Sequence, residues 1–345
     1  MTTTRGENNV GRMTLGAVRP RFASVVLAVA AVAGSAAPAV ALNSAQVRAE
    51  GAAIAAQRDT SGRLRIAVLQ SSFRQGAVAL LTITPSRRIT RLEGEAFGRG
   101  ITTWSTGNSL VWHALVGIPL DGAPGSREVV LRGSDPEGRI IDGRMTLRIV
   151  RAGFATRRLH VDPRFVDPPE SAAERIAREA RMLSGLWAET NGERLWRGPF
   201  SLPVPGAATS SFGRLTILNG QSRGRHQGTD FQASEGTPVR APNAGAVVLA
   251  DDLYMSGNTI VLDHGDGLFS LLAHLSKCRI QAGARVARGE IIGDTGATGR
   301  VTGPHLHWAV RLRGASINPL ALVAALARIK DSQGDQGDRG GNSSR

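Results

Sequence analysis

Apolar and polar positions alternate along the first part of the chain, from about residue 42 to residue 150. Every second side chain is apolar at 64–68 and again at 145–149, which is the period of a half-buried strand. Dipeptides such as Ser61-Gly62 and Asp121-Gly122 favour turns between such strands. Several short strands with glycine-rich turns and no long helix predict a β-sandwich-like accessory domain over residues 42–160.

A helical pattern begins after Pro168-Pro169. Four apolar residues recur at intervals of four, three and four, which places them on one helix face. They are Ile176, Ala180, Leu183 and Trp187. Ser171, with Glu174 three residues later, has capping-box spacing and is predicted to cap this helix. We predict a linker over 161–198 whose amphipathic helix docks on a neighbouring domain, and binding of a separate partner is the alternative.

Glycines and short apolar runs dominate from residue 199 to about residue 322. This pattern predicts strands at 247–250, 259–262 and 306–312, a strand-turn-strand passage at 287–292, and a helix at 320–329. The last sixteen residues, 330–345, hold no apolar side chain and are predicted to be a disordered tail. The fold class is therefore mainly β, with a second, antiparallel-β domain over residues 199–329.

The amino-terminal residues 1–41 have the three parts of a secretory signal. Four arginines precede residue 22, residues 22–34 are almost wholly apolar, and Ala39-Val40-Ala41 supplies small residues for a signal peptidase. This apolar run is short for the ~30 Å of a bilayer's hydrocarbon core. We predict a cleaved signal peptide and an exported protein, in the periplasm or cell envelope, with no stable membrane span. An uncleaved anchor is the alternative.

The net charge of +14 raises the question of an anionic partner. The arginines are scattered and lack the aromatic-interleaved stripe of nucleic-acid binders, so nucleic acid is not an expected partner. Mild attraction to an anionic matrix is the most that the charge indicates. Cys278 is the single cysteine, so no intramolecular disulfide forms. With no Cys-His signature around it, we expect a passive thiol.

Five of the seven histidines lie between residues 199 and 322. His305 and His307 are two apart in a predicted strand, so both imidazoles point to the same face. His226 and Asp230 are four apart in a glycine-containing stretch, and His274 adds a further imidazole. Zinc in catalytic sites takes three such protein groups and leaves one position open for water. Two histidines and one aspartate therefore predict a catalytic zinc site.

The remaining histidines carry no such pattern. His264 stands next to a Gly-Asp-Gly turn, and His113 lies in a mixed apolar run. We expect structural roles for these two and for His160. The chain contains no HExxH motif, so the glutamate base of the common zinc peptidases is missing and histidine must serve instead.

Taken together, these motifs resemble the lysostaphin-type (LytM-like) metallopeptidases. The matching stretches are Ser210-Ser211-Phe212-Gly213, 226–230, Gly236-Thr237-Pro238-Val239, His264-Gly265, Ala273-His274-Leu275, Gly293-Asp294-Thr295-Gly296, 303–307 and Asn318-Pro319. Their order and spacing fit the family across residues 199–322. The resemblance does not extend to the amino-terminal β region, although family members often carry accessory domains.

The resemblance implies a role for each of five residues. His226, Asp230 and His307 are expected to bind one Zn²⁺ per chain, and His274 and His305 to act as catalytic groups beside the reacting water. Which of the two assists proton transfer and which stabilises the oxyanion stays open. The family often has a tyrosine where this chain has Leu272, and we expect this departure to affect a substrate contact more than activity.

We therefore expect an exported zinc endopeptidase that hydrolyses the peptide cross-links of peptidoglycan. Family members cut glycine bridges or the D-Ala–diaminopimelate bond, and the predicted periplasmic setting favours the second. The alternative is a non-catalytic LytM-like regulator that binds the cell wall or activates a wall amidase. Such members have lost ligands, whereas all five residues are present here. A third reading makes the β-sandwich a wall- or partner-binding module, which we expect only as an accessory role.

Overall fold

The computed structural model describes residues 55–58, 63–105, 110–160, 168–189 and 192–329 of the 345-residue chain. The signal peptide and the tail predicted at 330–345 lie outside these residues. All of the described residues fall in a single compact unit. Among them, no helix has the length and apolar character needed to cross a membrane.

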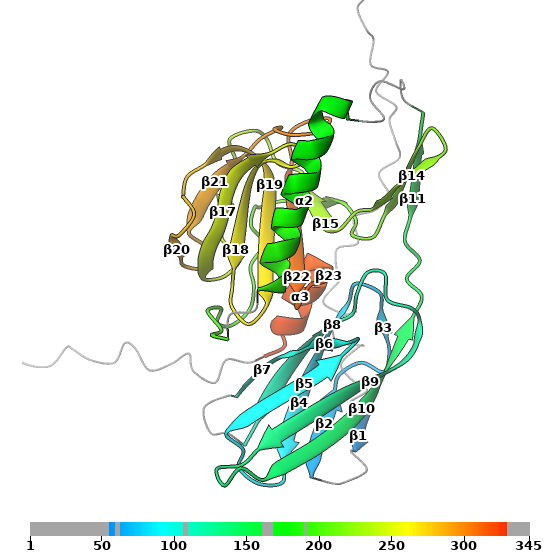
Figure 1. The fold of residues 1–345 in the computed structure, drawn as a ribbon, viewed down its shortest axis with the longest axis vertical. Helices are drawn as coiled ribbons and strands as arrows, with labels where there is room; N and C mark the ends of the chain where they lie inside the picture. Colours follow the sequence, from blue (N-terminus) through cyan, green and yellow to red (C-terminus); the bar gives the residue numbers. More distant parts are fainter. Residues whose placement is uncertain (1–54, 59–62, 106–109, 161–167, 190–191, 330–345) are drawn as a thin grey trace, which may run out of the picture. The chain divides into compact units, whose positions relative to one another are not determined.

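The amino-terminal strands form two five-stranded sheets, as predicted for a β-sandwich (Figure 1). The first contains, in spatial order, β1 (Ala55–Arg58), β2 (Leu64–Val68), β4 (Val78–Pro85), β8 (Trp112–Gly117) and β7 (Thr102–Ser105). The second contains β3 (Phe73–Arg74), β10 (Ile140–Val150), β9 (Gly125–Ser134), β5 (Arg91–Ala96) and β6 (Arg99–Gly100). Ladders are antiparallel except for β3 with β10.

The core of the sandwich follows from the alternation in the sequence. Leu64 and Ile66 of β2 are fully buried while Arg65 between them is exposed, and Leu147 and Ile149 of β10 are buried with Arg148 exposed. Apolar side chains of both sheets meet in one cluster. Burial of the inner faces is thus the main force that holds the two sheets together.

Helix α2 (Ala173–Ala188) comes after the sandwich in the chain. The predicted cap is wrong: Ser171 lies inside a short 3₁₀ turn, η3 (Glu170–Ala172), and Ala172 precedes the helix without a side-chain cap. The 3₁₀ turn begins at Glu170, so Ser171 lies within it and lacks the extended backbone of a capping residue. The ring of Trp187 packs edge-on against Phe269, with centroids 5.5 Å apart, so the helix docks within the chain as expected.

Most of the strands beyond the sandwich build one ten-stranded antiparallel sheet (Figure 1). Its main path is β12 (Ala208–Ser210), β15 (Gly228–Phe231), β22 (Leu306–Leu312), β19 (Leu268–Cys278), β18 (Gly257–Asp263), β17 (Gly245–Leu253) and β20 (Arg285–Val286). Beside it, β16 (Pro238–Arg240) pairs with β21 (Ile291–Thr295), β21 pairs with β19, and β23 (Ala315–Ile317) pairs with β22. The prediction of a mainly β, antiparallel fold is confirmed.

Two smaller features complete the fold. Helix α3 (Pro319–Leu326) begins after Asn318, whose side chain accepts a hydrogen bond from the Leu320 N–H, and so caps the helix. A separate three-stranded sheet is formed by β11 (Thr156–Leu159), β13 (Leu215–Leu218) and β14 (Gln221–Arg225). The parallel pairing of β11 with β13 joins a segment that follows the sandwich to the segment that precedes His226.

Candidate metal and catalytic site

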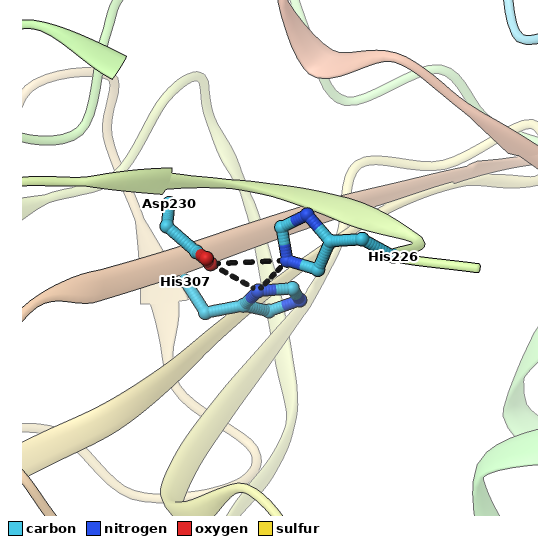
Figure 2. Close-up of side chains that lie close together, drawn as sticks. All are labelled: His226, Asp230 and His307. Atoms are coloured by element: carbon cyan, nitrogen blue, oxygen red, sulfur yellow. Dashed lines mark hydrogen bonds and ion pairs between the residues drawn. The ribbon is translucent and has the colours of Figure 1, made fainter. Parts of the chain in front are cut away.

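Two neighbouring strands bring the predicted metal ligands together. β15 and β22 are antiparallel, and their register sets Asp230 directly opposite His307, while His226 stands two residues before β15. Figure 2 shows the three side chains pointing toward one another. The Asp230 Oδ1 atom is 2.8 Å from His307 Nδ1 and 3.1 Å from His226 Nε2, and these two nitrogens are 3.0 Å apart.

The hydrogen-bond partners of His226 assign its tautomer. Its Nδ1 lies 3.2 Å from the Ser211 carbonyl oxygen. Because a carbonyl only accepts, Nδ1 carries the proton and Nε2 turns its lone pair toward Asp230 and His307. A second partner of this kind is the usual means by which proteins orient a metal-binding imidazole.

The protonation states of Asp230 and His307 also suit a metal. Burial acts to raise the pKa of the Asp230 carboxyl, but the adjacent imidazoles of His226 and His307 hold it far below its ordinary value. The side chain is therefore a carboxylate. Burial lowers the pKa of His307, so its imidazole is neutral at pH 7. A carboxylate and a neutral imidazole are donors that zinc accepts.

The triangle of donor atoms has nearly the right size for a metal ion. Tetrahedral ligands about 2.0–2.2 Å from zinc stand roughly 3.4 Å apart. The three observed edges of 2.8, 3.0 and 3.1 Å need to open by only a few tenths of an ångström. The residues present therefore fit a zinc ion, and three donors leave one tetrahedral position for a further ligand.

The two predicted catalytic histidines border this cluster. The His274 ring lies 4.8 Å from the His305 ring and 5.9 Å from the His307 ring, measured between centroids. His305 Nε2 is 3.9 Å from Asp230 Oδ1. All five residues singled out in the sequence thus meet in one place. One detail differs, because β22 begins at Leu306 and His305 precedes it in an isolated bridge to Gly296.

Backbone carbonyls orient both of these rings. His274 Nδ1 lies 3.0 Å from the Thr298 oxygen, and His305 Nδ1 lies 2.8 Å from the Gly303 oxygen. The Nδ1 atom of either ring therefore carries a proton, which in the neutral form of the ring leaves Nε2 as an acceptor. Burial, together with the nearby His307, lowers the pKa of His274 to about 4, so this ring is neutral at pH 7.

A β-bulge aims His274 into the site. Along β19, residues 273 and 274 together face one residue of β18, and the backbone of His274 has a φ of +64°. Positive φ is uncommon for a non-glycine residue and is typical of functional positions. The His274 N–H donates to the Ser256 oxygen at 2.9 Å, which holds the bulge in place. Side-chain spacing does not predict this irregularity, because bulges have no simple side-chain signature.

Leu272 lies in the apolar core, opposite Trp308 in the strand register, and is fully buried. The expectation that this departure from the family pattern alters a substrate contact is therefore wrong. The bulge that follows Leu272 separates the core-facing position from the site-facing His274.

The other histidines and the cysteine stay outside the cluster. His264 is fully buried, with Nδ1 2.7 Å from the Ala244 oxygen and Nε2 2.9 Å from Ser270 Oγ. The His113 ring packs beside Trp104, with centroids 5.4 Å apart. Burial raises the pKa of the Cys278 thiol, which supports a passive role.

The region that contains the cluster is similar in sequence to known peptidases. Residues 224–319 match the model of peptidase family M23. The peptidoglycan DD-endopeptidase ShyA of Vibrio cholerae is 37% identical over 146 residues, which are 41% of this chain and 34% of that protein. The DD-carboxypeptidase/endopeptidase Mpg of Neisseria meningitidis serogroup B is 42% identical over 98 residues, or 28% and 23% of the two chains.

These matches span about a third or less of the curated relatives' length. A crystal structure described as a putative peptidase M23 from Pseudomonas aeruginosa superposes with a TM-score of 0.57 at 27% identity. The superposition covers 74% of this chain and 96% of that one. The likeness therefore reaches well beyond the residues matched by the family model.

Proposed function

We propose that the chain, whose residues 224–319 match the model of peptidase family M23, is an exported zinc-dependent endopeptidase that hydrolyses peptide cross-links of peptidoglycan. One observation carries the proposal: three metal-type donor atoms converge within 3.1 Å of one another, beside two histidines oriented by backbone carbonyls. In this proposal residues 42–160 are an accessory domain, 161–198 a linker and 199–329 the peptidase domain.

Three residues hold the metal in this proposal. His226 binds through Nε2, Asp230 through a carboxylate oxygen and His307 through Nδ1, with one zinc per chain. When bound, zinc supplies Lewis-acid polarisation of the scissile carbonyl and lowers the pKa of water. The hydrogen bond from His226 to the Ser211 carbonyl keeps the imidazole turned toward the site.

His274 and His305 carry the proton chemistry. With Nδ1–H donated to a carbonyl, each ring accepts a proton at Nε2 and, once protonated, donates it to a leaving amine or a developing oxyanion. Their partners are equivalent in kind, since both Nδ1 atoms face backbone oxygens. We therefore assign proton transfer and oxyanion stabilisation to the two histidines together, without saying which histidine performs which.

The substrate class follows from the relatives and from the predicted export signal. The names of the two matched proteins include DD-endopeptidase and DD-carboxypeptidase/endopeptidase. These names favour a D-Ala–diaminopimelate cross-link over a glycine bridge. Peptidoglycan lies outside the cytoplasmic membrane, so the signal predicted at 1–41 agrees with action in the periplasm or cell envelope.

The competing function is a regulator that binds the wall or activates an amidase without cutting peptide bonds. A domain that serves only for binding has no need of a complete set of ligands and proton-transfer groups. Here all five residues are present, and their side chains meet beside the β15–β22 pair. The geometry therefore favours catalysis.

Digestion of purified peptidoglycan by the mature chain and its variants tests the proposal. We expect wild type to release cross-link cleavage products, and Asp230→Ala and His307→Ala to release none while staying folded. His160→Ala is a matched control, because His160 is exposed and lies outside the cluster. An active His307→Ala enzyme would refute the assignment of the metal ligands.

A further inference from the structure

The β-bulge that aims His274 into the site is held by the turn between β17 and β18. This turn consists of residues 254–256, and its Ser256 oxygen accepts the His274 N–H at 2.9 Å. A backbone φ of +64° is unfavourable for a residue with a side chain, so it persists only where the surrounding structure holds it. Whatever fixes this turn therefore also fixes the direction of the His274 imidazole.

The same turn packs against the loop whose carbonyl orients the His274 ring. The Met255 oxygen accepts the Arg300 N–H at 3.0 Å, and a Cβ atom at Gly257 would stand only 2.3 Å from the carbonyl carbon of Thr298. The turn and the loop thus leave no room for a side chain between them. Since the Thr298 oxygen lies 3.0 Å from His274 Nδ1, a displaced turn would disturb both the backbone and the ring of His274.

Helix α2 lies against the ten-stranded sheet (Figure 1) and supplies the group that fixes this turn. The Glu179 carboxylate accepts the Tyr254 N–H at 2.8 Å through Oε2. Its other oxygen, Oε1, accepts from Arg175 Nε at 2.6 Å, and Arg175 Nη2 donates to the Asp252 carbonyl oxygen at 2.7 Å. The helix therefore holds the chain both at the end of β17 and at the first residue of the turn.

Glu179 differs from an ordinary surface residue of a helix. Glutamate side chains are mostly exposed in proteins, as Glu174 is on the same helix, whereas the Glu179 side chain is only 12% exposed. Both of its oxygens are used, one in the ion pair with Arg175 and one in the bond to the turn. A hydrogen bond from a backbone N–H to a carboxylate is also stronger than one to a neutral oxygen. Glu179 therefore serves to attach the helix to the turn and not merely to cover the sheet.

We propose that Glu179 is a positioning residue for the proposed reaction: through the Tyr254 N–H it fixes the turn, and the turn holds His274 in place for proton transfer. The inference rests on the proposed function, because His274 has this task only if the chain is a peptidase. A misplacement of about 1 Å is enough to slow a reaction on the order of 100-fold, so small movements of the turn matter. The metal ligands are held by β15, β22 and the Ser211 carbonyl instead, so zinc binding does not depend on Glu179.

The test compares three single variants of helix α2. Glu179→Leu removes the acceptor, and leucine forms helices as readily as glutamate. Glu179→Gln keeps an oxygen that accepts the Tyr254 N–H, while Arg175, whose side chain is 39% exposed, turns toward solvent. Glu174→Leu is the matched control, because Glu174 is exposed on the same helix. The measurements are kcat and KM on a cross-linked stem-peptide dimer, zinc content, and hydrogen exchange of the His274 amide.

We expect Glu179→Leu to lower kcat roughly tenfold and to speed exchange of the His274 amide to a similar extent, with KM and zinc content unchanged. Glu179→Gln should keep most of the wild-type kcat, and Glu174→Leu all of it. Wild-type kcat in Glu179→Leu, or an equal loss in the leucine and glutamine variants, would overturn the inference. Should Glu179→Leu not fold, Glu179→Ala is measured in its place with the same expectation.

The exchange rate separates this inference from the proposed function, since it needs no substrate. If wild type cuts no peptide, the proposed function fails. Faster exchange of the His274 amide in Glu179→Leu, with wild-type rates in Glu179→Gln and Glu174→Leu, would still establish the link from α2 to His274. Equal rates in all four proteins would refute that link.

Discussion

The imidazole of His307 lies directly over Gly228. A Cβ atom at position 228 would stand 2.6 Å from both Nε2 and Cε1 of that ring, and 2.6 Å from the Trp308 carbonyl oxygen. Real Cβ atoms do not approach other atoms so closely, and the Trp308 oxygen belongs to a central strand that cannot yield. The glycine between His226 and Asp230 is thus part of the metal site, although it ligates nothing.

Gly228→Ala should therefore impair the metal site without touching a ligand. We expect the His307 ring to be displaced and zinc affinity to fall by roughly 10- to 100-fold, the usual effect of changes just outside a ligand set. Zinc titration against a competing chelator measures this. Gly153→Ala serves as the control, since a Cβ there meets nothing within 4 Å. Wild-type zinc affinity in Gly228→Ala would show that the strands shift freely.

The hydroxyl of Thr298 holds the loop that orients His274. Its Oγ1 donates to the Leu275 oxygen at 2.8 Å and accepts from the Asn258 N–H at 3.0 Å, while its own carbonyl accepts from His274 Nδ1. Thr298→Val should lower kcat roughly tenfold with zinc content unchanged, and Thr298→Ser should restore most of it. Steady-state kinetics of the two variants decides this, and an unchanged kcat in the valine variant would contradict it.

His264 predicts how the stability of the fold depends on pH. Burial lowers its pKa to about 4 from an ordinary value of 6.5. Between these two pH values the unfolded chain therefore binds a proton at His264 and the folded chain does not. Stability due to this residue is complete above pH 6.5 and is lost as pH falls toward 4, by at most about 1.4 kcal/mol per pH unit.

Urea unfolding at pH 7.5 and pH 5 measures this slope. His264→Gln should be less stable than wild type at pH 7.5, because it breaks the bonds to the Ala244 oxygen and Ser270 Oγ. Its stability should also fall less steeply toward pH 5. Parallel pH dependences in wild type and variant would mean that the pKa of His264 is the same in the folded and unfolded chains.

Much of the fold was readable from the sequence, because burial on one face leaves a clear period in the residues. The strand predicted at 306–312 is β22 (Leu306–Leu312), and the alternation at 64–68 is β2 (Leu64–Val68). The five histidine and aspartate positions were readable for a different reason: their spacing matches a family pattern. That resemblance assigned them, whereas the strand period only placed His305 and His307 on one face.

The features that were missed depend on backbone geometry or on distant contacts. The bulge at His274, the packing of His307 on Gly228 and the carbonyl partners of the imidazoles arise only when strands far apart in sequence are in register. The prediction that Ser171 caps the helix was wrong because Ser171 lies inside a 3₁₀ turn. Local spacing does not encode these relationships.

Zinc content of the purified mature chain, measured together with peptidoglycan digestion in the presence and absence of a chelator, tests the central claim most directly. We predict about one zinc per chain, cleavage that stops on chelation, and recovery when zinc is added back. Zinc without cleavage would leave a binding or regulatory protein. A folded chain that takes up no zinc, or cleavage that a chelator does not affect, would contradict the account.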